Sequence, residues 1–180
     1  MMQRAVFLDR DGVINRAIVR NGKPYPPDSL KELEILPGVP EALARLKQGG
    51  FWLIIATNQP DVARGIKTRK EIEALHQVLE SQLPIDEIRV CYHDDTDHCE
   101  CRKPKPGLLI EAARSFGLDL SASIMVGDRW RDIEAGQLAG CQTIFIDCDY
   151  AERKPQTPTV RVGSLVQAAD WILAQEGTAR

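Results

Sequence analysis

The stretch "AVFLDRDGVIN", residues 5–15, decides the fold class. Its apolar run, residues 5–8, is too short for a helix and ends abruptly in charge, a pattern typical of a strand buried on both faces of a parallel sheet. Two further runs, "FWLIIAT" at 51–57 and "SIMVGD" at 123–128, also lead directly into polar residues. The first strand is therefore expected to deliver Asp9, Arg10 and Asp11 to one end of a sheet.

Strand-like and helix-like segments alternate along the rest of the chain. "EIRVCY" at 87–92 and "TIFID" at 143–147 complete five expected strands, and apolar residues recur at helical spacing over 39–46, 72–83, 108–116, 132–139 and 165–174. This order predicts an α/β fold of the Rossmann-like, doubly wound type, with a parallel sheet and helices on both faces. We expect one domain spanning residues 1–180, with no large cap domain.

The composition is that of an ordinary globular protein, with 43% hydrophobic and 27% charged residues. No apolar run approaches the ~20 residues of a membrane helix, and the N-terminus lacks the apolar segment of a signal peptide. The net charge of −3 argues against binding to nucleic acid. We therefore expect a cytoplasmic protein, monomeric by default, that uses neither a membrane nor a nucleic acid.

Ligands of such sheets bind beyond the carboxyl ends of the strands, so the residues that follow the expected strands should converge. These residues are Asp9, Arg10, Asp11, Thr57, Asn58, Gln59, Arg102, Lys103, Gly127, Asp128 and Asp132, together with the cysteine stretch that precedes Arg102. Carboxylates gathered at one point repel each other unless a cation lies among them, and oxygen ligands of this kind suit Mg²⁺. A hydroxyl and a lysine at the same place would stabilise a phosphoryl group, so the set predicts phosphoryl transfer.

Asp9 and Asp11 are separated by one residue, which permits a division of labour. If the backbone is still extended there, the two carboxylates point the same way. Contact with a metal would keep Asp9 ionised as a nucleophile that forms an aspartyl-phosphate. Asp11, farther from the metal, could hold a proton for the leaving group and then take one from the attacking water.

Four motifs, "FLDRDGVIN", "ATNQPDVARG", "CRKPKPG" and "MVGDRWRDIEAG", occur in this order over about residues 6–141. They resemble those of the haloacid dehalogenase-like phosphatases, and more narrowly the branch that acts on heptose 1,7-bisphosphate or histidinol phosphate. The resemblance implies hydrolysis of a small sugar phosphate, foremost the C7 phosphate of the heptose compound, in the biosynthesis of nucleotide-activated heptose. Histidinol phosphate or another small phosphate ester is the alternative.

The resemblance also implies a role for each matching residue. Asp9 would be the nucleophile, Asp11 the general acid and base, and Thr57 and Lys103 the groups that stabilise the phosphoryl. The Mg²⁺ site would comprise Asp9, Asp11 and Asp128. The positions that would contact substrate are Arg10, Asn58, Gln59, Arg102 and Arg129. Asp132 is either a residue that starts a helix or an indirect partner of the metal.

Residues 91–107, "CYHDDTDHCECRKPKPG", contain three of the five cysteines. Cys91, His93, Cys99 and Cys101 are four ligands of the zinc type, and four protein ligands leave no open position for catalysis. In the resembling family this loop holds a structural zinc. We expect Zn²⁺ to order the loop and to aim Arg102 and Lys103, the alternative being vacant or partly oxidised thiols.

The chain departs from the heptose branch at several places, of which Pro60–Asp61, Arg129 and residues 15–37 matter most. The last segment is polar and rich in proline, and we expect it to help choose the substrate. His76 is expected at the surface or at the boundary of the core. Two other classes are considered, a phospho-accepting receiver and a zinc-dependent interaction module; the position of the Asp pair after the first strand and the motifs outside the cysteine loop count against them.

Overall fold

The computed structural model describes residues 3–178 and contains a six-stranded parallel sheet in the order β5-β4-β1-β6-β7-β8. The strands are β1 (Ala5–Leu8), β4 (Trp52–Asn58), β5 (Glu87–Cys91), β6 (Ile124–Gly127), β7 (Gln142–Ile146) and β8 (Val160–Val162). The helices are α1 (Val39–Gln48), α2 (Arg69–Gln82), α3 (Gly107–Phe116), α4 (Trp130–Ala139) and α5 (Leu165–Thr178). Two short 3₁₀ helices, η1 (Leu30–Glu32) and η2 (Asp95–Asp97), lie in connections.

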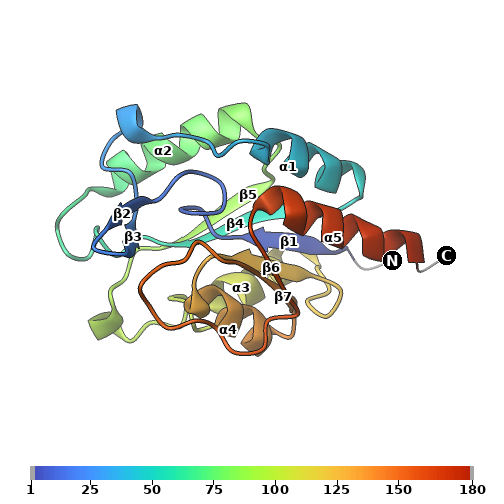
Figure 1. Ribbon diagram of the computed structural model, residues 1–180. Coiled ribbons are helices and arrows are strands. Elements are labelled where there is room, and N and C mark those ends of the chain that lie inside the picture. The colour runs from blue at the N-terminus through green and yellow to red at the C-terminus, as the bar shows by residue number, and fades with distance from the viewer. Residues whose placement is uncertain (1–2, 179–180) are drawn as a thin grey trace.

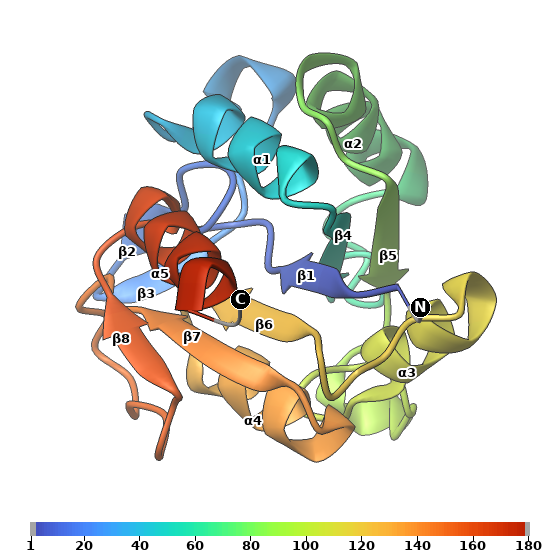
Figure 2. The same cartoon turned by 90° about the vertical axis from the view of Figure 1, so that its right-hand side faces the viewer.

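The helices cover both faces of the sheet, which confirms the predicted fold class. Figure 2 shows α1, α2 and α5 on one face and α3 and α4 on the other. Successive side chains of a strand point to opposite faces, so β1 contributes Val6 and Leu8 to the core under α1 and α5, and Ala5 and Phe7 to the core over α3. The central strand is therefore buried on both sides, as its uninterrupted apolar run indicates.

The ends of the helices follow from local chemistry. Helix α2 begins with a capping box, in which the Thr68 hydroxyl accepts a hydrogen bond from the Glu71 backbone N–H and the Glu71 carboxylate accepts one from the Thr68 N–H. Helix α3 ends at Gly117, which adopts a φ of 63°, a left-handed conformation that glycine accepts without steric cost. Among the described residues, no helix is both long and apolar enough to cross a membrane.

The segment 15–37 contains a β-hairpin of β2 (Ile18–Arg20) and β3 (Lys23–Tyr25) that the sequence analysis did not predict. Its turn is formed by Asn21 and Gly22, both with positive φ (51° and 73°), as a two-residue type I′ turn requires. The Asn-Gly pair was the available signal. Figure 1 shows the hairpin beyond the carboxyl ends of the parallel strands. The short edge strand β8 was also not predicted.

Candidate active site

The ends of four segments meet at a cavity of about 260 Å³ beyond the carboxyl edge of the sheet. Asp9 follows β1, Thr57 lies near the end of β4, Lys103 comes from the loop after β5, and Asp132 lies in the first turn of α4. The hairpin and the loop after β5 supply the outer walls. The full lining comprises Asp9, Asp11, Lys23, Pro24, Tyr25, Pro26, Thr57, Asn58, Pro60, Asp61, Arg64, Asp95, Arg102, Lys103, Arg129, Arg131 and Asp132.

Three buried carboxylates, those of Asp9, Asp128 and Asp132, each offer an oxygen within 4.8 Å of the others. Burial, and then repulsion by Asp132, raises the pKa of Asp9 to about 6 although Lys103 opposes the shift. Burial and repulsion by Asp9 raise the pKa of Asp128 well above its ordinary value. Asp128 Oδ1 is buried and has no hydrogen-bond partner among the described residues. An all-oxygen cluster that resists ionisation and has a free buried oxygen fits a hard dication such as Mg²⁺.

The cluster differs in one member from the predicted metal site. The carboxylate of Asp11 is not part of it, and Asp132 occupies the third place. Asp132 also accepts a hydrogen bond from Lys103 Nζ at 2.6 Å and one from the Arg129 backbone N–H at 3.0 Å. Asp132, expected either to start a helix or to assist the metal site indirectly, lies in the first turn of α4 and belongs to the charged centre.

Lys103 is almost fully buried and reaches the expected nucleophile directly. Its Nζ donates to Asp9 Oδ1 at 2.9 Å. Burial alone would lower the pKa of Lys103, but the charges of Asp132 and Asp9 outweigh it and the pKa is raised, so the ammonium stays charged. Asn58 fixes the lysine backbone, since its side chain donates to the Lys103 carbonyl at 3.0 Å and accepts from the Lys103 N–H at 3.1 Å. Asn58 also lines the cavity.

Thr57 is held by Gln59. The Thr57 side chain is 1% exposed and its Oγ1 accepts a hydrogen bond from Gln59 Nε2 at 2.9 Å. Because the oxygen accepts this bond, the hydroxyl proton is free to be donated into the cavity. Gln59 Nε2 also donates to Asp11 Oδ2 at 3.0 Å, and Gln59 does not line the cavity. The amide expected to contact substrate therefore lies behind two residues that line the cavity.

Asp11 is held by a dense set of donors. Arg10 Nη2 lies 3.1 and 3.0 Å from its two carboxylate oxygens, and Asn15 Nδ2 donates to Oδ1 at 3.0 Å. Burial acts to raise the pKa of Asp11, but the charge of Arg10 and the hydrogen bonds from Asn15 and Gln59 outweigh it and the pKa is lowered. In the absence of substrate these donors favour the carboxylate form of Asp11, the form that a general base requires.

Arg10 is a positioning group in the structure. Its residue has no exposed surface and does not line the cavity, in contrast to the predicted contact with substrate. The Nη1 nitrogen of Arg10 lies 2.9 Å from His76 Nε2 on α2. An arginine only donates, so His76 accepts as a neutral ring; burial and then the Arg10 charge lower the pKa of His76 to about 4. The prediction that His76 lies near the surface is wrong, because it is 6% exposed and pairs with Arg10.

Arg102 and Arg129, both expected to contact substrate, line the cavity and are already paired with acids. Arg102 Nε donates to Asp95 Oδ1 at 2.8 Å, and Arg129 Nη2 to Glu152 Oε2 at 2.7 Å. Asp61, whose role the sequence left open, faces the cavity as well, and so does Arg64. The entrance of the cavity therefore carries charges of both signs, and the guanidinium groups of Arg102 and Arg129 are held in place by acidic partners.

The four predicted zinc ligands meet in space. Cys91 Sγ lies 3.7 Å from both His93 Nδ1 and Cys99 Sγ, while Cys101 Sγ lies 3.5 Å from Cys99 Sγ and 3.3 Å from His93 Nδ1. A tetrahedral zinc with Zn–S bonds of about 2.3 Å separates its sulfur ligands by about 3.8 Å, close to these values. All five cysteines lie in the described part of the chain and none forms a disulfide. The geometry fits a closed, four-ligand metal site.

Several residues of the site carried no recognisable signal in the sequence. Tyr150 donates its hydroxyl to Asp128 Oδ2 at 2.7 Å, and Glu152 binds Arg129; both come from the connection between β7 and β8. His76 lies 66 positions from its partner Arg10. Asn15, four residues after Asp11, was the one accessory group close enough in sequence to be suspected.

The chain is similar to known proteins over most of its length. A family model for haloacid dehalogenase-like hydrolases matches residues 27–140. D-glycero-beta-D-manno-heptose-1,7-bisphosphate 7-phosphatase of Pseudomonas aeruginosa is 38% identical, with 81% of this chain and 82% of the relative aligned, and the enzyme of that name from Escherichia coli K12 is 35% identical over 94% and 87%. The crystal structure of D,D-heptose 1,7-bisphosphate phosphatase from B. bronchiseptica, complexed with magnesium and phosphate, superposes with a TM-score of 0.83 at 31% identity, covering 96% of this chain and 99% of that chain.

Proposed function

This chain belongs to the haloacid dehalogenase-like hydrolase family, and from that membership we propose that it is a Mg²⁺-dependent phosphatase that removes the C7 phosphate of D-glycero-β-D-manno-heptose 1,7-bisphosphate. The observation that supports the chemistry best is the convergence of Asp9, Lys103 and Asp128 at one cavity. The substrate follows from relatives of that name at 35–38% identity.

The proposed reaction consists of two displacement steps, both carried out by residues of the cavity. An oxygen of Asp9 attacks phosphorus, the ester P–O bond breaks, and the leaving oxygen takes a proton from Asp11. Water then attacks the aspartyl-phosphate, Asp11 accepts a proton from it, and inorganic phosphate leaves with Asp9 restored. The negative charge of an incoming phosphoryl group raises the pKa of Asp11, so its carboxylate takes up a proton from solvent and then gives that proton to the leaving oxygen.

The remaining groups stabilise charge. Lys103 and the free hydroxyl proton of Thr57 face the equatorial oxygens of the phosphoryl group as negative charge builds on them. A bound Mg²⁺, held by Asp9 and Asp128 with Asp132 beside it, would supply further positive charge for the phosphoryl oxygens and keep Asp9 ionised. The positions of Arg10, Asn58 and Gln59 support roles in holding Asp11, Lys103 and Thr57.

We place the enzyme as a single-domain monomer in the cytoplasm, with a small sugar phosphate and no nucleic acid as its partner. A structural Zn²⁺ on Cys91, His93, Cys99 and Cys101 orders the loop that carries Arg102 and Lys103. Histidinol phosphate is the alternative substrate, and no relative described above bears that name.

The assignment is tested by comparing kcat/KM for both anomers of heptose 1,7-bisphosphate, histidinol phosphate and sugar monophosphates, with and without Mg²⁺. We expect the β-bisphosphate to exceed the monophosphates by about 10-fold or more, since one additional hydrogen bond to a charged group is worth about 1.5–3 kcal/mol. Chelation of Mg²⁺ should abolish turnover of every substrate. Histidinol phosphate as the best substrate would contradict the proposed specificity and leave the phosphatase chemistry intact.

Lys23 is the cationic residue best placed to receive the second phosphate. The other cations of the cavity wall each pair with a carboxylate of the chain; these are Arg64, Arg102, Lys103, Arg129 and Arg131. Lys23, at the start of β3, lines the same cavity, and its side chain has no hydrogen-bond or ion-pair partner within residues 3–178. Its charge is therefore available to an anion of the substrate.

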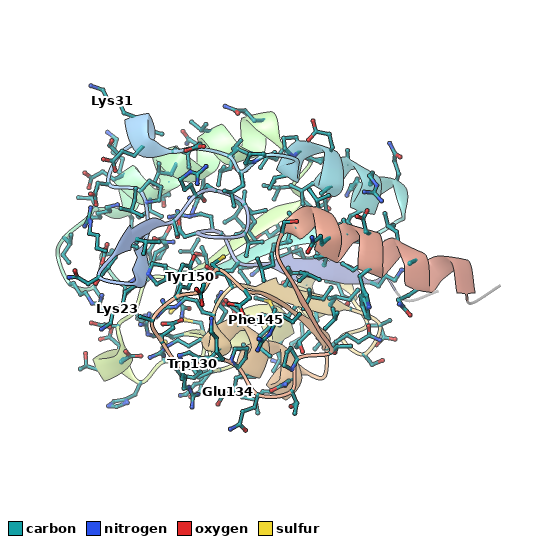
Figure 3. All side chains as sticks on the ribbon, in the orientation of Figure 1. Lys23, Lys31, Trp130, Glu134, Phe145 and Tyr150 are labelled. Atoms are coloured by element: carbon teal, nitrogen blue, oxygen red, sulfur yellow. The ribbon has the colours of Figure 1, made fainter. Side chains whose placement is uncertain are left out.

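We expect Lys23→Gln to lower kcat/KM for the bisphosphate by about 10-fold, the lower end of the range for an exposed charged hydrogen bond, and to change it less than 2-fold for a sugar monophosphate. Lys31→Gln is the matched control, because Lys31 lies on the same 15–37 segment but outside the cavity; Figure 3 shows it extending away from the molecule. Equal losses for both kinds of substrate would show that Lys23 does not read the second phosphate.

A further inference from the structure

The connection between β7 and β8, residues 147–159, passes over the start of α4 and contacts two consecutive residues of the active site. Tyr150 binds Asp128, and two positions later Glu152 binds Arg129 through both carboxylate oxygens, at 2.9 and 2.7 Å. Tyr150 is buried although it belongs to a loop. A connecting loop usually lies outside a catalytic centre, so these contacts call for an explanation.

The two oxygens of Asp128 have different environments. Oδ2 accepts the hydrogen bond of the Tyr150 hydroxyl at 2.7 Å, whereas Oδ1 is buried and has no hydrogen-bond partner among the described residues. Asp128 and Tyr150 are 2% and 8% exposed, so water does not readily replace either contact. The tyrosine thereby selects which oxygen is left for the cluster of Asp9 and Asp132.

Gly12 closes the space around this hydrogen bond. A Cβ at Gly12 would lie 1.9 Å from Asp128 Oδ2 and 2.7 Å from the Tyr150 hydroxyl oxygen, so the backbone packs directly against both. Gly12 also has a φ of 89°, a conformation that side chains disfavour. The Asp128 carboxylate is thus confined at Oδ2 by the Gly12 backbone, with Tyr150 as its hydrogen-bond donor there.

The loop that carries Tyr150 is anchored at residues 151 and 153, directly after it. The Ala151 backbone N–H donates to the Gly22 carbonyl at 2.8 Å, which joins the loop to the turn of the hairpin. Arg153 lies over the Trp130 ring at 3.5 Å and donates to Glu134 at 2.9 Å. The hydroxyl of Tyr150 is therefore presented from a fixed backbone.

We infer that Tyr150 is a positioning residue for the divalent cation: its hydroxyl binds Asp128 Oδ2 and so turns Oδ1 toward Asp9 and Asp132. Partners that orient a metal ligand typically contribute 10- to 100-fold to metal affinity. The role rests on the proposed cation site but not on the identity of the substrate. It assigns a function to a loop residue that lies outside all four sequence motifs.

The test is the dissociation constant of Mg²⁺ for substrate-free wild-type and Tyr150→Phe proteins, measured by titration calorimetry, with Mn²⁺ and its electron paramagnetic resonance signal as a second probe. We expect Tyr150→Phe to weaken cation binding by about 10- to 100-fold. The half-saturating Mg²⁺ concentration for hydrolysis of p-nitrophenyl phosphate should rise equally, while kcat at saturating Mg²⁺ changes less than about 3-fold. Tyr92→Phe, which removes a hydroxyl outside the cluster, is the matched control and should leave the affinity unchanged.

The outcomes separate the inference from the proposed function. A wild-type protein that binds Mg²⁺ and a folded Tyr150→Phe variant that binds it equally well would overturn the role of Tyr150 alone. A wild-type protein that neither binds Mg²⁺ nor releases phosphate would overturn the proposed function itself. If Tyr150→Phe does not fold, Tyr150→Gln, which keeps a donor, replaces it; binding within about 3-fold of wild type supports the inference, and loss of binding in that folded variant counts against it.

Discussion

Asp9→Asn is expected to lower Mg²⁺-dependent phosphate release by at least roughly 10⁴-fold, the scale on which covalent enzymes lose turnover when the nucleophile is removed. An amide has the shape of the carboxylate but does not form the acyl-phosphate bond. The measurement is release of inorganic phosphate from the bisphosphate and from p-nitrophenyl phosphate. The rate of phosphate release should fall to the same extent for both substrates, because the same atom attacks phosphorus in each.

The same variant should remain folded. Burial and Asp132 raise the pKa of Asp9 to about 6, so its carboxylate is less stable in the folded protein than in the unfolded chain at neutral pH, and an uncharged asparagine removes that cost. Lys103 keeps Asp132 as a partner at 2.6 Å. We therefore expect the unfolding temperature of the metal-free variant not to fall. Asp170→Asn, at an exposed carboxylate paired with Arg45, is the control with unchanged turnover; undiminished activity in folded Asp9→Asn would refute the assignment of the nucleophile.

Opening the cysteine cluster is expected to give the second largest loss. Cys99→Ala removes one of four ligands, and we expect kcat/KM to fall by roughly 10²- to 10³-fold, the effect of losing one preorganised group that stabilises the transition state. The cause would be loss of order in the loop that carries Lys103, with no reactive metal involved. To test this cause, the zinc content, the limited proteolysis of residues 91–106 and the rate of hydrolysis are all measured on one preparation.

The control for that experiment is Cys148→Ala, because Cys148 is exposed and lies outside the cluster. It should retain both zinc and activity. A zinc-free protein with full activity and a protease-resistant loop would contradict the structural role of the metal. Recovery of activity on adding Mg²⁺ alone, without Zn²⁺, would do the same.

The sheet could be predicted because its central strands are buried on both faces. A strand such as β4 must then be almost continuously apolar, and that pattern is visible without knowledge of its neighbours. The hairpin and β8 escaped prediction because three-residue strands with exposed positions have no such pattern. Asn21–Gly22 is the local signal of the hairpin turn, but this pair lies in a segment that is otherwise dominated by proline and charged residues.

The residues expected at the site lie at or directly behind it, because parallel strands bring their carboxyl ends to one edge. Which of them faces the cavity could not be predicted. Arg10 points inward because His76, on a distant helix, offers an acceptor there, and Tyr150 comes from a loop with no periodic pattern. Contacts between segments far apart in the chain leave no local trace in the sequence.

The hairpin turn at Gly22 is joined by a backbone hydrogen bond to the loop that carries Tyr150. The hairpin thus lines the entrance of the cavity, while the residues proposed for bond cleavage follow the strand ends. We expect an exchange of residues 16–37 between relatives to change selectivity, with Asn15 kept because it donates a hydrogen bond to Asp11. At this junction a Cβ on residue 22 would lie 2.5 Å from the Ala151 Cβ, so an exchanged hairpin must keep glycine at position 22 to fit against the receiving loop.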